Sequence, residues 1–307
     1  MRYRFLGRTG TKVSEICFGT QTFGWGADEG AAHAMADHFV EAGGNFFDTS
    51  DKYNDGESER ILGTWLRTQR RDDVVIASKT YFDLGDGPNE MGATRKRIMR
   101  QIDRTLERLG TDHLDLYQVH SATHESGVLD DRRLLAEMSE LKREGVRFGF
   151  STSGPDQASV IARALDATVD GVRLFDAVQA TWNLLEPSAD AALAEAHAAG
   201  LGVIVKEAVA NGRLTDRNDD GDFADRHRVL AGEAERLGTT IDALALRAAL
   251  ERPWADVVLS GAATVAQLEA NAAALAVAWD DAAAERLATL AEDPAAYWRR
   301  RSALAWT

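Results

Sequence analysis

Short apolar runs alternate with longer segments of helical periodicity along almost the whole chain. Eight such runs follow one another, at residues 16–19, 46–48, 74–79, 114–120, 148–151, 177–179, 202–206 and 257–260. A strand that is covered on both faces reads as a nearly continuous apolar run, and parallel strands need a crossover helix between them. The pattern therefore predicts eight parallel strands joined by helices.

Helical segments lie between the runs. In residues 94–109, for example, Ile98, Ile102, Leu106 and Leu109 recur at the spacing of one helix face. A glycine at 43, 110, 145 or 200 follows four of these segments, where a left-handed C-cap is expected. The predicted helices are residues 31–42, 58–66, 94–109, 134–144, 157–165, 189–199, 223–236 with 241–250, and 265–275.

Eight strand–helix units predict an α/β fold of the (β/α)8 TIM-barrel type, in one domain that spans residues 1–307. Residues 3–6 and 13–15 read as an N-terminal β-hairpin that could plug the bottom of the barrel. Residues 281–290 read as an extra helix, followed by a C-terminal tail rich in Trp and Arg. The basic run at 299–301 is expected to be a solvated helix face.

Composition narrows the class of partner. The formal net charge is −14, which disfavours binding to nucleic acid or to an anionic membrane surface. No run of about 18 apolar residues occurs, and the single Cys17 excludes an intrachain disulfide. We expect a cytoplasmic protein that acts on a small molecule; the sequence carries no signal for an oligomeric state.

Polar residues end several of the predicted strands. Asp48 ends the second, Lys79 the third and His120 the fourth, and Tyr53 follows Asp48 by five residues. Taken singly, each reads as a cap, a solvated strand end or a packed histidine. Active sites of (β/α)8 barrels lie at the C-terminal ends of the strands, so the joint placement of all four favours a catalytic role.

These four side chains suit the reduction of a carbonyl group. Hydride addition leaves an alkoxide that needs a proton, and Tyr53 can donate one if its pKa is shifted from about 10. The Lys79 ammonium is expected to lower that pKa, with Asp48 fixing the lysine. His120 can hydrogen-bond the carbonyl oxygen, while a nicotinamide cofactor supplies the hydride.

Several segments, in their order and spacing, resemble the aldo-keto reductase family over nearly the whole chain. They are residues 3–10, 18–20, 46–53, 75–79, 115–120 and 260–262, with Gln267 and Asn271. The resemblance implies Tyr53 as general acid, Lys79 and Asp48 as the groups that tune it, and His120 as the group that orients the substrate. It also implies NADPH or NADH as cofactor.

The cofactor-binding residues implied by the resemblance lie at strand ends and in the loops that follow. They are Gly19, Thr20, Gln21, Asp48, Ser151, Thr152, Gln179, Lys206, Glu207, Asn211, Gly212, Arg213, Leu214, Ser260, Gly261, Ala262, Thr264, Gln267 and Asn271. Substrate contacts are expected from Trp25, Tyr53, Tyr81 and His120. No metal ligand is predicted.

Three positions depart from the family pattern. Thr152 stands where Asn usually helps to hold the nicotinamide, and a hydroxyl replaces only one of the two hydrogen-bonding functions of an amide. Lys206 or Glu207 stands where an aromatic ring often stacks on the nicotinamide. Residues 263–265 contain no Arg or Lys for a 2′-phosphate. NADP(H) is therefore only slightly favoured over NAD(H).

Other motifs fit less well. Gly24, Gly26 and Gly30 miss the G-x-G-x-x-G spacing of a dinucleotide-binding turn by one residue. The sequence around Ser151 lacks the second Gly of a nucleophile elbow. Residues 216–221 match half of a calcium loop, but His227 occupies the position that needs a Glu.

Two other functions stay open. A cofactor-binding regulatory or sensor protein can use the same barrel without turnover. A metal-dependent hydrolase is suggested by His113, His120 and His124, although the first strand lacks the expected pair of histidines.

Overall fold

Eight parallel strands close into a barrel in the computed structural model, which describes residues 1–80 and 95–304. The strands follow the ring in chain order, and the last pairs with the first. All eight predicted strands are present, and the (β/α)8 fold is confirmed. They are β3 (Ile16–Gly19), β4 (Phe46–Asp48), β5 (Val75–Thr80), β6 (Leu116–Val119), β7 (Phe148–Thr152), β10 (Phe175–Thr181), β11 (Gly202–Lys206) and β12 (Val257–Ser260).

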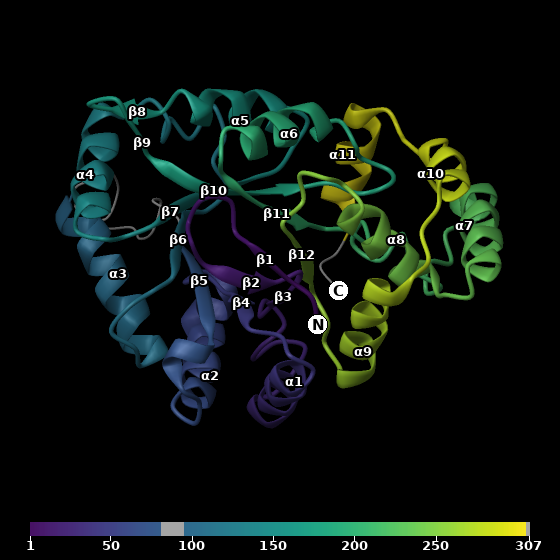
Figure 1. Ribbon diagram of the computed structural model, residues 1–307, viewed down its shortest axis with the longest axis horizontal. Coiled ribbons are helices and arrows are strands. Elements are labelled where there is room, and N and C mark those ends of the chain that lie inside the picture. Colours follow the sequence, from purple (N-terminus) through teal and green to yellow (C-terminus); the bar gives the residue numbers. More distant parts are fainter. Residues whose placement is uncertain (81–94, 305–307) are drawn as a thin grey trace.

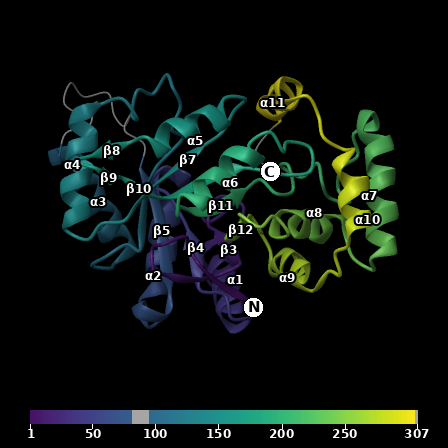
Figure 2. The same ribbon diagram turned by 45° about the horizontal axis from the view of Figure 1, so that its top comes forward.

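Helices surround the barrel, as Figures 1 and 2 show. Side chains of Asp28, Asp131, Thr240 and Thr264 cap the first turns of four of them, because each accepts a backbone N–H that lacks a partner within the helix. The helices between or after barrel strands are α1 (Glu29–Glu41), α2 (Glu57–Leu66), α3 (Arg95–Leu109), α4 (Arg132–Arg143), α5 (Gln157–Leu165), α6 (Asp190–Ala198), α7 (Ala224–Arg236), α8 (Ile241–Leu250) and α9 (Val265–Ala273).

The predicted helix ends match those of the structure or differ by at most two residues, for local reasons. The first helix begins at Glu29, two residues earlier than expected, because the Asp28 side chain receives the N–H of Ala31. Helix α7 is preceded by a separate 3-10 turn, Gly221–Phe223, whose cap is Asp220. The four glycines expected at C-caps, at positions 43, 110, 145 and 200, all have positive φ, which confirms that prediction.

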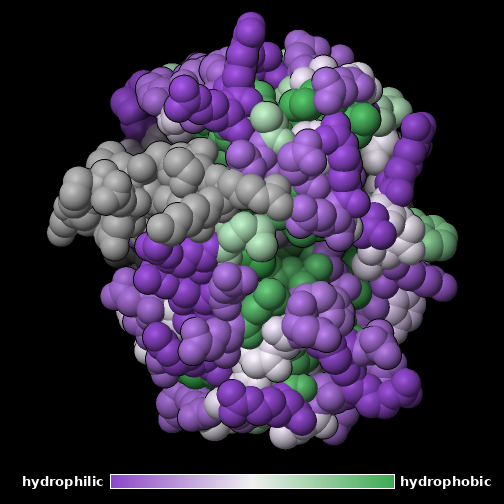
Figure 3. Space-filling view, turned by 90° about the vertical axis from the view of Figure 1, so that its left-hand side faces the viewer, coloured by the Kyte–Doolittle hydropathy of each residue, from purple (hydrophilic) through white to green (hydrophobic). Residues whose placement is uncertain are grey.

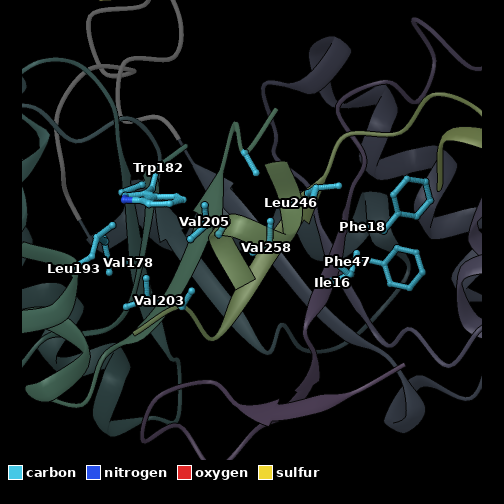
Figure 4. Packing of buried hydrophobic residues seen from close by; sticks show 14 of the residues in the cluster. Ile16, Phe18, Phe47, Val178, Trp182, Leu193, Val203, Val205, Leu246 and Val258 are labelled. Carbon is cyan, nitrogen blue, oxygen red and sulfur yellow. The ribbon is translucent and has the colours of Figure 1, made fainter. Parts of the chain in front are cut away.

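The barrel wall has two faces because successive side chains of a strand point to opposite sides. Phe18 and Phe47 lie on the outer face, with ring centroids 5.9 Å apart, and pack toward the helices (Figure 4). The inner face begins with an apolar layer that contains Cys17, Phe46 and Ala77. Two residues further along β4 and β5, the inner face carries Asp48 and Lys79, so the fold places buried charge just above the apolar layer.

The N-terminal hairpin closes the other end of the barrel. Strands β1 (Tyr3–Phe5) and β2 (Lys12–Ser14) pair antiparallel, and Leu6 packs into the inner apolar layer. Gly7 has φ +50°, and a Cβ there would lie 2.3 Å from the backbone nitrogen of Gly202, at the start of β11. The hairpin therefore plugs the end where the strands begin, as the sequence predicted.

The C-terminal region contains more structure than expected. The extra helix is present as α10 (Asp281–Ala288), and the tail rich in Trp and Arg, for which no helix bounds were predicted, forms a further helix, α11 (Pro294–Ala303). Asp293 caps α11 and Pro294 occupies its first turn. The expectation of a solvated Arg299–301 face is wrong for Arg301, which is 8% exposed and pairs with Glu207.

A small hairpin, β8 (Thr168–Val169) and β9 (Val172–Arg173), was also not predicted. On the side of the molecule that α3 and α4 cover, hydrophilic residues dominate the surface, and a narrow patch of apolar residues lies among them (Figure 3). Across the described ranges 1–80 and 95–304, no helix has the length and apolar character needed to cross a membrane.

Candidate active site

A buried ion pair forms the centre of the site. Lys79, on β5, is fully buried and donates to Asp48 Oδ1 on the neighbouring β4, where Asp48 is 2% exposed. The other carboxylate oxygen, Oδ2, accepts from the amide nitrogens of Gln118 at 3.1 Å and Gln179 at 2.9 Å. Both carboxylate oxygens thus accept from donors, as a buried charge requires.

Tyr53 completes this centre. The Lys79 ammonium also donates to the Tyr53 hydroxyl at 3.0 Å and to the backbone oxygen of Thr49 at 2.9 Å. Tyr53 begins a 3-10 turn, Tyr53–Gly56, in which Asn54 and Asp55 adopt left-handed conformations. The Asn54 side chain donates to the Gly24 carbonyl at 2.8 Å, which ties this turn to the loop after β3. The turn therefore presents the phenol to the lysine.

Burial and charge act in opposite directions on the lysine and the tyrosine. Burial alone would lower the pKa of Lys79, but Asp48 and Tyr53 outweigh it and raise that pKa, so the side chain is a cation. Burial raises the pKa of the Tyr53 phenol and outweighs the Lys79 charge, which pulls it down. The expected net lowering of the Tyr53 pKa is therefore wrong, and in the protein without cofactor Tyr53 keeps its proton.

His120 faces the same centre from the next strand. Its ring centroid lies 5.9 Å from that of Tyr53, with the two rings nearly perpendicular. Burial, with charge from Lys79, Lys206 and Lys52, lowers the pKa of His120 to about 3. The imidazole is therefore neutral at physiological pH, with one ring N–H to donate.

The opposite wall carries residues that were assigned to the cofactor. Ser151 on β7 and Gln179 on β10 are direct neighbours in the sheet register, and each is 2% exposed. Thr152 belongs to the other face of β7 by the alternation of side chains, and its buried hydroxyl has no hydrogen-bond partner among the described residues. The structure thus brings Ser151 and Gln179 together and leaves Thr152 apart from them.

Lys206 lies at the end of β11, four strands round the ring from β5, so it enters the mouth opposite Lys79. Its ammonium donates to Ser153 Oγ, and no carboxylate of the described residues forms a salt bridge with it. Burial lowers the pKa of Lys206. Lys206 is thus a half-buried lysine at the strand end where the resemblance led us to look for an aromatic ring.

The loop after β11 is held by the C-terminal helix. Glu207 has φ +56° and receives two bonds from Arg301, at 2.7 and 3.0 Å. Arg213 is 6% exposed and binds Glu292 through both terminal nitrogens, at 3.0 and 2.6 Å. Its guanidinium, expected to meet a phosphate, is thus engaged within the protein; Leu214 is fully buried. The backbone N–H of Gly212, in the loop also expected to meet a phosphate, donates to the Val209 carbonyl at 3.1 Å.

The segment after β12 forms a compact polar corner. Asn271 donates to Ser260 Oγ at 2.8 Å, and Gln267 receives the N–H of Ala263 at 2.8 Å. Thr264 caps the following helix, α9. Gly261 and Ala262 join Ser260 to this corner.

The loop that follows β3 lies against the catalytic strand β4. Gly19 pairs with Asp48 in the register of β3 and β4, and Thr20 is fully buried and donates its N–H to the Asp48 carbonyl at 2.9 Å. Gln21 is half-buried in the same loop. Thr20 therefore has a structural role whatever else it contacts.

Of the expected substrate residues, Trp25 is 57% exposed in the loop after β3, and Tyr81 lies outside the described residues. Two residues near the tetrad were not singled out from the sequence. Gln118 is a fully buried polar residue inside an otherwise apolar strand, which was the available signal. Ser50 gave no comparable signal, because its role depends on a contact with His120 across 70 residues.

The histidines of the alternative metal site do not converge. His113 precedes β6 and pairs with Asp112, whereas His120 follows β6 at the other end of the barrel. His124 contacts Ser159 at 2.8 Å. Within residues 1–80 and 95–304, no group of three or more His, Cys, Asp or Glu side chains is arranged to hold a metal ion.

Comparison with known proteins adds family information to this geometry. Residues 15–292 match the model of the aldo/keto reductase family. The uncharacterized oxidoreductase YrpG of Bacillus subtilis is 32% identical over 310 residues, which cover 91% of this chain and 93% of that protein.

A probable voltage-gated potassium channel subunit beta of Oryza sativa is 38% identical over 123 residues, covering 39% of this chain and 37% of that protein. Among solved structures, the aldo-keto reductase AKR11C1 from Bacillus halodurans, in its holo form, superposes with a TM-score of 0.79 at 27% identity. That match covers 95% of this chain and 97% of the other.

Proposed function

The chain belongs to the aldo/keto reductase family, and we propose that it reduces an aldehyde or ketone to an alcohol with a nicotinamide cofactor, in a reversible reaction. One observation carries the proposal. A protonated Tyr53 hydroxyl lies 3.0 Å from a buried ammonium whose countercharge is fixed by two glutamines, with a neutral imidazole beside it.

Each of the four residues has a distinct task. Tyr53 gives its proton to the carbonyl oxygen as charge develops there. Lys79 stabilises the phenolate that remains, because the ammonium is already within hydrogen-bond distance and needs no reorganisation. Asp48 keeps Lys79 charged in a site where burial favours the neutral amine. His120 donates its ring N–H to the carbonyl oxygen and orients it.

The residues of the opposite wall suit a nicotinamide. Ser151 and Gln179 offer a hydroxyl and a carboxamide side by side in a buried mouth, a donor set that matches an amide group. Ser260, Gln267 and Asn271 lie on the adjoining wall. The cofactor, when bound, supplies the hydride.

NADP(H) is our proposal over NAD(H), on a narrow margin. Ser260 and Thr264 carry hydroxyls near the start of α9. The dipole at a helix N-terminus would stabilise the negative charge of a 2′-phosphate there. Residues 263–265 contain no cation, so we expect the affinity for NADPH to exceed that for NADH by a modest factor.

A test uses Tyr53→Phe, which removes the hydroxyl and keeps the ring. Binding of NADPH is followed by the quenching of Trp fluorescence, and turnover by the loss of NADPH absorbance with an aromatic aldehyde. We expect both proteins to bind NADPH alike and only the wild type to oxidise it in an aldehyde-dependent way. Equal turnover by Tyr53→Phe would overturn the assignment.

A second candidate rests on the similarity to the rice channel subunit. A regulatory protein on this barrel would bind the cofactor and respond to it without rapid turnover. The complete tetrad favours the enzyme, and the two functions separate in the same assay. Tight NADPH binding by the wild type without aldehyde-dependent oxidation would favour the regulatory function.

A further inference from the structure

Ser50 lies between the catalytic strand β4 and Tyr53 and is fully buried. Its hydroxyl oxygen is 3.1 Å from His120 Nδ1, 3.3 Å from Asp51 Oδ1 and 3.4 Å from the Lys79 carbonyl oxygen. It also accepts the backbone N–H of Lys52 at 3.2 Å. One hydroxyl proton thus has three acceptors within reach.

Both alternative acceptor groups are also bound by other donors. Asp51 accepts the Thr80 hydroxyl at 3.1 Å through its other oxygen, Oδ2, and the Lys79 carbonyl oxygen accepts the backbone N–H of Asp51 at 3.2 Å. His120 Nδ1 is the nearest of the three to Ser50. The arrangement therefore favours donation from the Ser50 hydroxyl to His120 Nδ1.

The direction of this bond decides what His120 can do. A neutral imidazole carries one proton, on Nδ1 or on Nε2, and the hydrogen bond made by one nitrogen selects the state of the other. If Nδ1 accepts from Ser50, the proton is on Nε2, which can then donate to a substrate oxygen. If Nδ1 donates to Ser50, Nε2 becomes an acceptor and would repel a carbonyl oxygen.

We propose that Ser50 is a positioning residue that fixes His120 in the tautomer with its proton on Nε2. This inference rests on the proposed function for its catalytic consequence, but the tautomer itself is a property of the protein alone. In this role Ser50 acts through His120 and does not need to contact substrate or cofactor. The methyl group of alanine cannot fill that role.

The direct test is nitrogen NMR of the cofactor-free, full-length protein labelled with ¹⁵N-histidine. The signal of His120 is assigned by its loss in His120→Asn. We expect a proton bound to Nε2 and an unprotonated Nδ1 in the wild type and in Ser50→Thr, which keeps the hydroxyl. In Ser50→Ala we expect both ring nitrogens to shift toward values averaged over the two tautomers.

The remaining histidines serve as an internal control, because their signals report whether Ser50→Ala is folded. A proton on Nδ1 in the wild type would overturn the proposal, as would a His120 spectrum that is the same in Ser50→Ala. If Ser50→Ala does not fold, the wild-type and Ser50→Thr spectra still decide the outcome.

Kinetics then test the consequence. We expect Ser50→Ala to lower kcat with a carbonyl substrate about tenfold, the factor that corresponds to losing roughly one hydrogen bond, while the affinity for NADPH stays unchanged. Ser50→Thr should restore most of kcat. An unaltered kcat in Ser50→Ala would overturn the positioning role. A wild type without any carbonyl-dependent turnover would instead overturn the proposed function and leave the NMR result to stand on its own.

Discussion

The Asp48–Lys79 pair should dominate the response of this barrel to substitution. Asp48→Asn keeps the shape of the side chain and removes its charge, so the Lys79 ammonium remains at 0% exposure with only neutral acceptors. Lys79→Met does the reverse, because it leaves a carboxylate with two amide donors and no cation. The double substitution removes both charges from the same buried site.

The magnitude follows from the burial of both partners. Removing one member of a buried pair typically costs about 3–5 kcal/mol, since the charge left behind loses its compensation. We expect each single variant to lose about that much free energy of unfolding. The double variant should lose less than the sum of the two, with an interaction energy of about 2 kcal/mol or more.

The assay is equilibrium unfolding in urea near neutral pH without cofactor, followed by circular dichroism and Trp fluorescence together. Glu57→Gln is the matched control, because Glu57 and Arg60 form an exposed pair with side chains 48% and 54% accessible. That variant should change the free energy of unfolding by less than about 0.5 kcal/mol. Additive losses in the double variant, or single losses no larger than the control, would refute the reasoning.

Three further predictions concern the pH response, the plug and the C-terminal helix. The pKa of His120 is about 3 in the folded protein and about 6.5 in the unfolded chain, so its contribution to stability is lost as pH falls from 6.5. Burial is the main cause that raises the pKa of Asp51 from 3.8 to about 6, so its contribution to stability is lost as pH rises toward 6. Urea unfolding at about pH 5 and pH 6 gives the slope of the free energy of unfolding against pH. Relative to the wild type, this slope should be lower in His120→Asn and higher in Asp51→Asn, by up to ~1.4 kcal/mol per pH unit. Equal slopes in the three proteins would contradict these assignments. Gly7→Ala should lower the melting temperature far more than Gly10→Ala. Both glycines have positive φ, but only at Gly7 would the new Cβ meet backbone atoms, at 2.3 Å. Similar losses in the two variants would mean that the N-terminal hairpin can shift to accommodate the Cβ. Arg301→Met leaves the half-buried Glu207 without its cation, so it should raise the Kd for NADPH at least about threefold and speed hydrogen exchange in α11. Arg299 is exposed, and Arg299→Met should do neither.

The barrel could be predicted because its signals are local and repeated. Each strand is an apolar run and each helix has a 3.6-residue period, so the eightfold alternation was readable without tertiary information. The β8–β9 hairpin was missed although Asp170-Gly171 is a strong two-residue turn signal, because strands of two residues leave no alternation to detect.

The bounds of the C-terminal helix were not predicted, for a different reason. Asp293-Pro294 is a helix start, but the polar residues that follow gave no apolar face to confirm it. Arg301 is buried through a partner 94 residues away, which no local pattern can indicate.

The candidate site divides in the same way. Asp48, Lys79 and His120 could be predicted from their places at strand ends, because the fold brings all strand ends to one rim. The direction in which the Tyr53 pKa is shifted could not be predicted, since it depends on burial outweighing the nearby Lys79 charge. The roles of Gln118 and Ser50 depend on contacts across the barrel that only the closed structure supplies.

The central claim is that this protein moves a hydride from a nicotinamide to a carbonyl carbon with Tyr53 as the acid. The most direct measurement supplies NADPH carrying deuterium at both C4 positions, together with an unlabelled aldehyde, and examines the alcohol by mass spectrometry. We predict an alcohol that carries a single deuterium on carbon with the wild type and none formed with Tyr53→Phe. Alcohol without deuterium, or the same labelled yield from Tyr53→Phe, would contradict the account.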